Sequence, residues 1–457
     1  MEKATANGGR RSSHVLLFAY PMHGHMSPML QFAKRLASKG LLVTFLTTSS
    51  VTESLQIDLP PSYPIHLRFI SDFHTEVIET LKQRHEAFAA AVSRSLGEFL
   101  DGALINGDHP PRLMVFDSVM PWAMEVARSR GLEAAPFFTE SAAVNHILNQ
   151  VYEGSLSIPA PENAAVSIPS LPNLEAEDLP YFPSVIREVT LEFMTRQFSS
   201  FKDAKWIFIN TFDQLEPQIV NWMGERWPIK TVGPTVPSAY LDGRLEKDKT
   251  YGLKRQKPED GRAVEWLDSK ETASVVYISF GSLVMLAEKQ VKELTNFLTE
   301  SGLPFLWVLR ESEMEKLPEN FIQETSGKGL VVNWCSQLEV LSHKAVGCFV
   351  THGGWNSTLE ALSSGVPMVA VPQWIDQTTN AKFIADVWEI GVRVKLNEKH
   401  EIATKDELEA SIRQVIEGRE KKNSIKWRKL AKEAVDEGGS SDKNIEDFAK
   451  TIMLLSN

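Results

Sequence analysis

The chain is 457 residues long, which exceeds the size that one hydrophobic core usually serves and therefore predicts two domains. Hydrophobic residues make up 43% of it and charged residues 23%, a balance that is typical of a globular enzyme and excludes a disordered or fibrous chain. The formal net charge of −11 argues against a nucleic-acid partner, because binding to phosphate backbones requires clustered Lys and Arg.

The cysteines and the N-terminal residues indicate the compartment. Cys335 and Cys348 are the only cysteines, and they lack the spacing of a disulfide framework or a zinc site. Residues 1–13 are polar and are not followed by a separate apolar signal core, and no run of roughly 18 apolar residues could form a transmembrane helix. We expect a cytoplasmic protein without integral membrane association.

The first half of the chain alternates short apolar runs with helical patterns. Residues 14–20 predict a strand, 21–28 (PMHGHMSP) a loop, 29–40 a helix and 41–48 a second buried strand. The same alternation returns between residues 112 and 151. It predicts a parallel sheet with helices on both faces.

Two less regular segments interrupt this pattern. The Pro-rich residues 158–183 predict an extended surface loop, and the charged segment that follows Gly233 predicts a linker. We therefore place an N-terminal domain at 1–240, a linker at 241–260 and a C-terminal domain at 261–457. This division leaves open that the last helix packs back on the N-terminal domain.

Five further strand-like runs follow the linker, so the second half is expected to be another doubly wound α/β domain. These runs are residues 274–282, 304–310, 329–334, 346–354 and 367–372. Ligands of open parallel sheets bind beyond the carboxyl ends of the strands. Two facing domains would therefore enclose a cleft where such ends meet.

The segment VGCFVTHGGWNSTLEALSSGVPMVAVPQ predicts a strand, a glycine turn, a helix and another strand. Gly353 and Gly354 allow a tight turn that approaches a ligand closely. The helix that begins near Asn356 and Ser357 would point unsatisfied N–H groups past the turn. A phosphate is the expected occupant, with His352 adding a hydrogen bond from the strand end.

A second strand-end turn at Phe280–Ser282 could hold another phosphate oxygen. Other interpretations are open at this point. Ser357 to Glu360 also matches a capping box, in which Glu360 would serve only its own helix. Trp334 and Trp355 could equally be packing residues and not platforms for a nucleotide.

Residues 334–377, WCSQLEVLSHKAVGCFVTHGGWNSTLEALSSGVPMVAVPQWIDQ, resemble the signature of plant UDP-dependent glycosyltransferases over its full length without a gap. The resemblance extends over essentially the whole chain. The N-terminal half is most similar to the branch that glucosylates salicylate, auxin-like acids, thiohydroximates, terpenoids and steroids. The resemblance implies a GT-B fold, in which two doubly wound, Rossmann-like α/β domains face a cleft.

The resemblance also implies a donor site for UDP-glucose. Trp334 would stack on the uracil near Cys335 and Gln337, and Glu360 would hold the ribose hydroxyls. The other donor contacts would come from the diphosphate-binding residues Ser282, His352, Asn356 and Ser357 and from the sugar-binding residues Thr139, Trp355, Asp376 and Gln377. Gln377 together with Trp355 resembles glucose users. Gly353 stands where the family commonly has cysteine, and we expect only local loosening of the backbone there.

His25 and Asp117 follow two predicted strands, so both could face the cleft. A histidine held by a buried carboxylate suits a general base, although these residues alone also fit a loop histidine and a helix-start aspartate. The family uses the histidine of a GH-x-x-P motif as base and an aspartate to orient it, and His25 and Asp117 match those positions. His23 adds a second imidazole where many relatives have Gln, and the spacing to Pro28 favours His25.

The acceptor pocket is expected to involve Met22, His23, Phe88, Met120, Phe138, His146 and the loop 181–185. These residues do not choose between a phenolic, a terpenoid and a steroid. No Asp-x-Asp pair and no metal-ligand spacing occurs in the sequence, so we expect a monomeric enzyme that needs no metal or cofactor besides its co-substrate UDP-glucose.

The resulting hypothesis is an inverting glucosyltransferase that forms a β-glucoside on a hydroxyl, or on a carboxyl, of a hydrophobic plant small molecule. Two alternatives belong to other classes. An NAD-dependent oxidoreductase could use two α/β domains, but G-x-G-x-x-G does not follow the first strand. A non-enzymatic binder of apolar ligands would have no need of His25 and Asp117.

Overall fold

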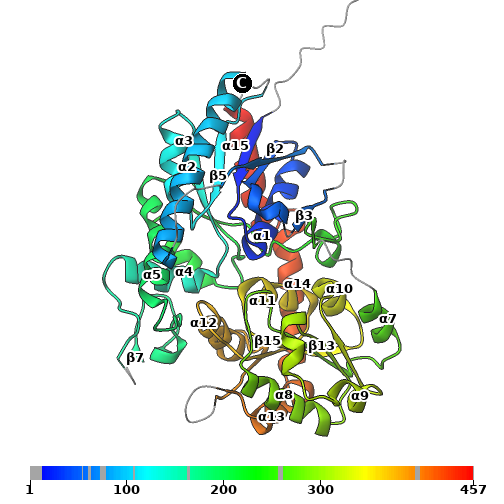
Figure 1. The fold of residues 1–457 in the computed structure, drawn as a ribbon. Helices are drawn as coiled ribbons and strands as arrows, with labels where there is room; N and C mark the ends of the chain where they lie inside the picture. Colours follow the sequence, from blue (N-terminus) through cyan, green and yellow to red (C-terminus); the bar gives the residue numbers. More distant parts are fainter. Residues whose placement is uncertain are drawn as a thin grey trace, which may run out of the picture.

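Two parallel sheets, each lying between layers of helices, make up the computed structural model (Figure 1). The residues that the structure describes are 13–53, 55–59, 63–72, 79–106, 109–161, 165–255, 261–396 and 402–455. Residues 256–260 of the predicted linker and 1–12 of the polar N-terminal segment lie outside this range. The doubly wound architecture expected for each half is confirmed.

The N-terminal sheet has seven parallel strands in the order β10-β9-β6-β5-β1-β2-β4. Its strands are β1 (His14–Phe18), β2 (Leu42–Thr48), β4 (Ile65–Ile70), β5 (Leu113–Asp117), β6 (Glu133–Phe138), β9 (Ile207–Ile209) and β10 (Ile229–Thr231). Helices cover both faces, so Leu16 and Phe18 pack into one core while Val15 and Leu17 pack into the other. This two-sided burial explains why β1 is a continuous apolar run.

The helices around this sheet are α1 (His23–Ser38), α2 (Leu81–Asn106), α3 (Trp122–Arg128), α4 (Ala142–Tyr152), α5 (Arg187–Arg196) and α6 (Pro217–Gly224). The prediction of a loop through residues 21–28 is wrong, because α1 already begins at His23 and contains Pro28. His25 therefore lies in the first turn of a helix, directly beyond the end of β1.

The C-terminal sheet has six parallel strands in the order β14-β13-β12-β15-β16-β17. They are β12 (Val275–Ser279), β13 (Phe305–Val308), β14 (Gly329–Val332), β15 (Val346–Thr351), β16 (Met368–Ala370) and β17 (Gly391–Arg393). The helices are α7 (Arg262–Asp268), α8 (Glu288–Glu300), α9 (Phe321–Thr325), α10 (Gln337–Ser342), α11 (Trp355–Ser364), α12 (Gln377–Lys382), α13 (Lys405–Glu417), α14 (Glu420–Val435) and α15 (Ser440–Leu454). All five expected strands are present, and β17 is an additional edge strand.

The Pro-rich segment is not entirely irregular. Within it, β7 (Ala165–Val166) and β8 (Leu174–Glu175) form a small antiparallel pair. Another small pair joins β3 (Leu55–Ile57) to β11 (Leu253–Arg255), which lies far along the chain. Short 3-10 or π turns complete the elements: η1 (Ser49–Glu53), η2 (Ala176–Asp178), η3 (Gln197–Asp203), η4 (Ser238–Tyr240), η5 (Glu311–Lys316) and η6 (Phe383–Val387).

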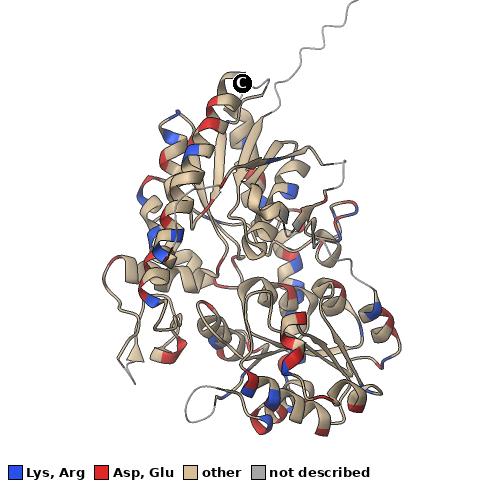
Figure 2. Cartoon of the chain, in the orientation of Figure 1, with Lys and Arg blue, Asp and Glu red and all other residues tan. Residues whose placement is uncertain are grey.

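Two segments of the chain link the C-terminal domain to the N-terminal domain. The last helix, α15, lies against α1 and β10, with Phe448 packed edge-on against Phe208 (Figure 1). The residues from Leu241 to Arg255 are held against α1 by buried ion pairs, including Lys34 Nζ to Asp248 Oδ1 at 2.7 Å. In Figure 2 the charged residues lie mainly on the outer helices, and the central strands are mostly tan. None of the helices in the described part is long and apolar enough to cross a membrane.

Candidate active site

The structure brings His25 and Asp117 together at the carboxyl edge of the N-terminal sheet. His25 comes from the first turn of α1 and Asp117 is the last residue of β5, the neighbour of β1. His25 Nδ1 lies 2.9 Å from Asp117 Oδ2, and Thr139 Oγ1 lies 3.4 Å from the same nitrogen. Asp117 is fully buried, whereas the His25 side chain keeps 20% of its surface exposed. Asp117 thus fixes Nδ1 and leaves Nε2 as the ring atom that can accept a proton.

The two histidines of the GH motif have different surroundings. His23 is exposed, and its Nδ1 lies 3.3 Å from the hydroxyl of Ser27. The Asp117 carboxylate contacts His25 instead. This geometry supports the choice of His25 that the spacing to Pro28 favoured.

Two further carboxylates, those of Glu140 and Asp376, influence His25, and Glu140 was not among the residues predicted from the sequence. Burial alone would lower the pKa of His25, but Asp117, with contributions from Glu140 and Asp376, raises it to about 9. Burial also raises the pKa of Glu140 to about 7 and that of Asp376 to about 6. Glu140 is buried, and its Oε2 has no hydrogen-bond partner. Glu140 lies two residues after the end of β6, and Asp117 is the last residue of the neighbouring strand β5, so its position near a strand end is the signal that could have found it.

Pro28 has a structural consequence that reaches the other domain. A proline has no N–H, so the carbonyl of Gly24, four residues earlier in α1, lacks its usual helical donor. Asn356 Nδ2 of α11 donates to that carbonyl at 2.7 Å. The Asn356 amide, which was expected to contact the diphosphate, therefore joins α1, the helix that carries His25, to the C-terminal domain.

An aromatic cluster lies beside His25. The Tyr20 ring packs edge-on against His25 at 5.5 Å and against Phe88 at 5.3 Å between ring centroids. Phe193 of α5 lies 6.3 Å from Tyr20 and stacks on His85. We call Tyr20, Phe88 and Phe193 the aromatic cluster; of these, only Phe88 was predicted from the sequence.

Other predicted acceptor residues lie elsewhere. Phe138 and His146 have no exposed surface, and Met120 is 1% exposed, so these side chains offer almost nothing to an acceptor. Phe138 packs with Phe198 in the core, and His146 stacks on Trp222. The structure thus places them in the core. Met22 caps α1 next to His25 and is partly exposed.

The predicted loop 181–185 reaches the opposite domain. Tyr181 forms an antiparallel bridge with Ile375, the residue before Asp376. Tyr181 is 49% exposed and Val185 is 93% exposed. The loop therefore contacts the C-terminal domain next to Asp376, with the side chains of Tyr181 and Val185 accessible and that of Phe182 buried.

His352 lies between the two glycine turns of the C-terminal domain. A Cβ atom on Gly281 would come within 2.8 Å of the His352 ring, and one on Gly354 within 2.5 Å, so only glycine fits at either position. Burial lowers the pKa of His352 to about 4. Burial thus favours the neutral form of His352 at physiological pH, and its hydrogen bond to a diphosphate stays a prediction.

Gly353 occupies the left-handed region with φ of 79°, and a Cβ there would meet nothing closer than 3.6 Å. Glycine adopts this conformation without strain, whereas a side chain is disfavoured by its backbone conformation and not by its neighbours. We expected glycine in place of cysteine to loosen the backbone locally. The positive φ instead indicates that glycine avoids the backbone strain that a cysteine would have at this position.

The second turn presents Ser282 as an exposed residue after Gly281. Arg310 holds this turn in place, because its guanidinium donates to the carbonyls of Ser282 and Val284 and pairs with Glu313 at 2.9 Å. Arg310, which follows β13, was not predicted, because in the sequence it cannot be distinguished from an ordinary surface arginine.

Glu360 is not part of a capping box, since α11 begins at Trp355 and Ser357 lies inside the helix. Its carboxylate instead accepts hydrogen bonds from Gln337 Nε2 at 2.6 Å and from Tyr251 Oη at 2.8 Å. Gln337 also donates to Ser357 Oγ at 2.9 Å. Burial raises the pKa of Glu360 to about 7. These contacts gather three of the predicted donor residues around one carboxylate.

Trp334 and Cys335 directly precede α10, next to this group. Trp334 is partly exposed, whereas Cys335 is buried with its thiol 3.7 Å from Tyr277 Oη. The stacking of Trp334 on a uracil stays a prediction.

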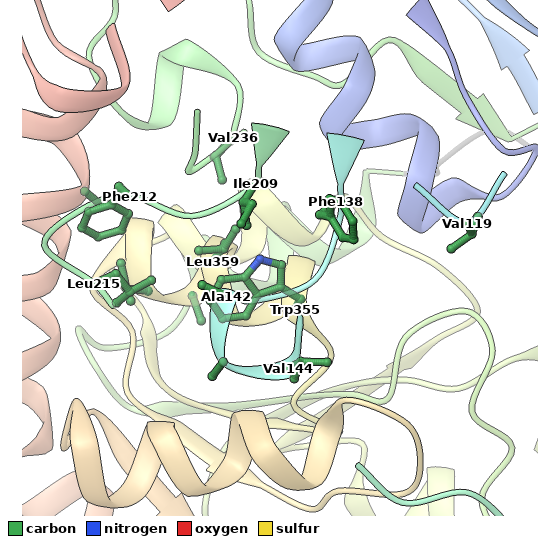
Figure 3. Close-up of a cluster of buried hydrophobic side chains, with 14 of the residues drawn as sticks. Val119, Phe138, Ala142, Val144, Ile209, Phe212, Leu215, Val236, Trp355 and Leu359 are labelled. Carbon is green, nitrogen blue, oxygen red and sulfur yellow. The ribbon is translucent and has the colours of Figure 1, made fainter. Parts of the chain in front are cut away.

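Trp355 resolves one of the alternatives left open by the sequence. Its indole is 4% exposed and donates to the Asn210 carbonyl at 2.7 Å, across the domain interface. Figure 3 shows it packed with Leu359 among Ile209, Phe212 and Leu215 of the N-terminal half. The indole therefore packs in the domain interface, and the backbone N–H of Trp355 hydrogen bonds to Asp376, which is a predicted sugar-binding residue.

Asp376 and Gln377 lie at the start of α12. Asp376 Oδ2 accepts from Asn380 Nδ2 at 2.7 Å. Gln377 Oε1 accepts from the backbone N–H groups of Gln373 and Trp374 at 2.9 and 3.2 Å, which shapes the turn before the helix. Within the described ranges, no group of three His, Cys, Asp or Glu residues could hold a metal ion.

Comparisons with known proteins match this arrangement. Residues 186–435 match the family model described as UDP-glucoronosyl and UDP-glucosyl transferase. Mogroside I-E synthase of Siraitia grosvenorii is 67% identical over 99% of this chain and 100% of its own length, and UDP-glycosyltransferase 74E2 of Arabidopsis thaliana is 44% identical over 96% and 99%. Among solved structures, Os79 from O. sativa in complex with UDP has a TM-score of 0.88 and 37% identity and covers 96% of this chain and 100% of its own. The chain therefore belongs to the plant UDP-glycosyltransferases, enzymes of GT-B fold that transfer a sugar from a UDP-sugar to a small molecule.

Proposed function

We propose that this enzyme transfers glucose from UDP-glucose, with inversion at the anomeric carbon, to a hydroxyl of a hydrophobic small molecule. The observation that carries the proposal is the His25–Asp117 pair, whose Nδ1 to Oδ2 distance is 2.9 Å, at the edge of an aromatic cluster. His25 Nε2 takes the proton of the acceptor hydroxyl while the acceptor oxygen attacks C1 of the glucose. The bond from C1 to the UDP oxygen breaks, and the product is a β-glucoside.

The charge of the leaving UDP would be met without a metal or other cofactor. The N–H groups at the start of α11 and the backbone turns at Gly281 and Gly353 would supply hydrogen bonds to the diphosphate. Neutral His352 and the hydroxyls of Ser282 and Ser357 would add hydrogen bonds. Asp117 stabilises the imidazolium that forms on His25.

The carboxylates around His25 suggest a reason for choosing a neutral hexose. Asp117, Glu140 and Asp376 all raise the pKa of His25. A donor such as UDP-glucuronate would bring a fourth carboxylate toward this group, which is unfavourable in a partly buried site. UDP-glucose should therefore be preferred to UDP-glucuronate, and Gln377 with Asp376 should favour it over UDP-galactose.

The acceptor class follows from the aromatic cluster and from relatives. Mogroside I-E synthase is named for the glycoside that it makes, and Os79 was crystallised with a trichothecene. We propose a terpenoid, steroid or phenolic alcohol as acceptor, with the aglycone of mogroside I-E as the first to assay. An ester of a carboxylic acid is the alternative product.

The experiment is an assay of UDP release with UDP-glucose, UDP-galactose and UDP-glucuronate against a panel of these acceptors, with NMR of the product. A β-anomeric glucoside formed mainly from UDP-glucose is the expected result. An α-anomeric product would contradict the inverting mechanism, and equal rates with the three donors would contradict the assignment of the sugar site.

A further inference from the structure

Tyr251 lies in the segment between the two domains, just before β11, and its side chain contacts Glu360 of the C-terminal domain. Its hydroxyl donates to Glu360 Oε1 at 2.8 Å, while Gln337 Nε2 donates to Oε2 at 2.6 Å. Glu360 is 6% exposed, and Tyr251 is partly buried against the main core. The two oxygens of this carboxylate therefore have one donor each, Tyr251 from the segment between the domains and Gln337 from the C-terminal domain.

Tyr251 is anchored on the N-terminal domain from both sides. The carbonyl of Thr250 accepts from Lys34 Nζ of α1 at 2.6 Å. The carbonyl of Gly252 accepts from the Asp58 N–H at 2.8 Å, where β11 begins to pair with β3. A Cβ on Gly252 would come within 2.6 Å of Leu59, so the chain there is closely packed against that loop.

The buried ion pair next to Tyr251 makes this anchor rigid. Lys34 is 1% exposed and pairs with Asp248 Oδ1 at 2.7 Å. Asp248 also accepts from Gln31 Nε2 and from the Ser238 N–H at 2.6 and 2.7 Å. A chain of short contacts thus runs from α1, the helix that carries His25, through Lys34 and Thr250 to Tyr251 and Glu360.

We infer that Tyr251 is a positioning residue of the nucleotide site, through which the N-terminal domain orients the Glu360 carboxylate toward the ribose hydroxyls. This inference rests on the proposed UDP-glucose site. An ionised carboxylate has about four acceptor positions, so hydrogen bonds from Tyr251 and Gln337 leave capacity for two hydroxyl groups of a ribose. A carboxylate whose orientation is already fixed loses less conformational entropy when the ribose binds, so the entropic cost of binding is smaller.

The test uses Tyr251→Phe, which removes only the hydroxyl, with two ligands, UDP and 2′,3′-dideoxy-UDP. The matched control is Tyr63→Phe, because Tyr63 Oη donates to the Glu246 carbonyl at 3.2 Å in the same segment but does not reach Glu360. Binding is measured by calorimetry, kcat and KM for UDP-glucose are measured in parallel, and the melting temperature reports on folding.

For Tyr251→Phe we expect the Kd of UDP and the KM for UDP-glucose to rise about 5-fold, the usual effect of one lost hydrogen bond. The Kd of dideoxy-UDP should change by less than about twofold, because this ligand has no hydroxyls for Glu360 to bind. The kcat at saturating donor and all values for Tyr63→Phe should stay near those of the wild type.

An equal loss of affinity for both ligands would mean that Tyr251 acts only on the packing of the domains and would overturn the inference. An unchanged Kd of UDP would overturn it as well. Failure of the proposed function looks different, since the wild-type enzyme would then not bind UDP in the first place.

Discussion

His25 and His352 occupy equivalent places in the two domains, and their chemistry is opposite. Each follows a strand of a parallel sheet and lies at the start of a helix or just before one. Asp117 and its acidic neighbours raise the pKa of His25 to about 9, whereas burial without a charged partner lowers the pKa of His352 to about 4. The same residue at the same kind of strand end is thus strongly basic in one domain and weakly basic in the other.

The comparison shows that the two doubly wound domains place different kinds of chemical groups at their strand ends. The N-terminal edge collects ionisable side chains, which proton transfer requires. The glycine turns of the C-terminal edge, where we propose that the diphosphate binds, offer backbone N–H groups, which do not titrate. The predictions below test this division, beginning with the largest expected effect.

The largest effect is expected for His25→Ala. This change removes the proton acceptor and leaves the nucleotide site untouched, so kcat should fall by roughly 10²–10⁴ while the Kd of UDP stays near normal. Steady-state kinetics and calorimetry measure the two quantities. His23→Ala is the matched control and should keep most of the activity. A reversed pattern, with His23→Ala inactive, would mean that the other histidine is the base.

Asp117→Asn keeps the shape of the pair but removes its charge. We expect kcat to fall by roughly 10²-fold or more, and the double variant with His25→Ala to be no slower than His25→Ala alone, because the two residues act as one unit. The imidazolium also loses its nearest anion, so the rising limb of the pH–rate profile should move to lower pH. A limb that moves to higher pH, or additive losses, would contradict this arrangement.

The affinity for UDP-glucose should fall as the pH falls. A site that relied on a cationic histidine would instead bind the donor more tightly at low pH. Glu360 has a pKa of about 7 and must be ionised to accept from the ribose, whereas His352 stays neutral. The Kd of UDP-glucose should therefore rise several-fold as the pH falls from about 8 to about 5.5. UDP-glucose is the suitable probe because its diphosphate does not titrate in this range. Tighter binding at low pH would indicate that His352 becomes charged.

The smallest effect is expected at Gly353. Its φ of 79° disfavours any side chain, although no neighbour blocks one, so Gly353→Ala should lower the free energy of unfolding by about 1 kcal/mol. Chemical denaturation measures this change. Gly102→Ala near the C-terminal end of α2, where nothing lies within 4 Å of the new Cβ, is the control and should be neutral or stabilising.

The sequence predicted the parts of the site that depend on chain order. Strand ends and glycine turns are local, so the positions of His25, Asp117, His352 and Glu360 follow from apolar runs and from the resemblance to a family. The start of α1 at His23 was missed because Pro28 is usually read as a helix boundary.

What could not be predicted depends on which way a side chain points across distant segments. Phe137 and Phe138 lie on opposite faces of β6, and both are buried because helices cover both faces of the sheet. No local pattern separates such a core residue from one in a pocket. Tyr251 contacts a glutamate 109 positions along the chain, so its role becomes visible only once the two domains are placed together.

The most direct test of the division between the two histidines is an NMR titration of their imidazole groups, assigned with the variants His25→Gln and His352→Gln. The account predicts that the His25 signal titrates with a pKa near 9 and that the His352 signal does not titrate down to about pH 5. A pKa near 6.5 for both rings, or a higher pKa for His352 than for His25, would contradict it.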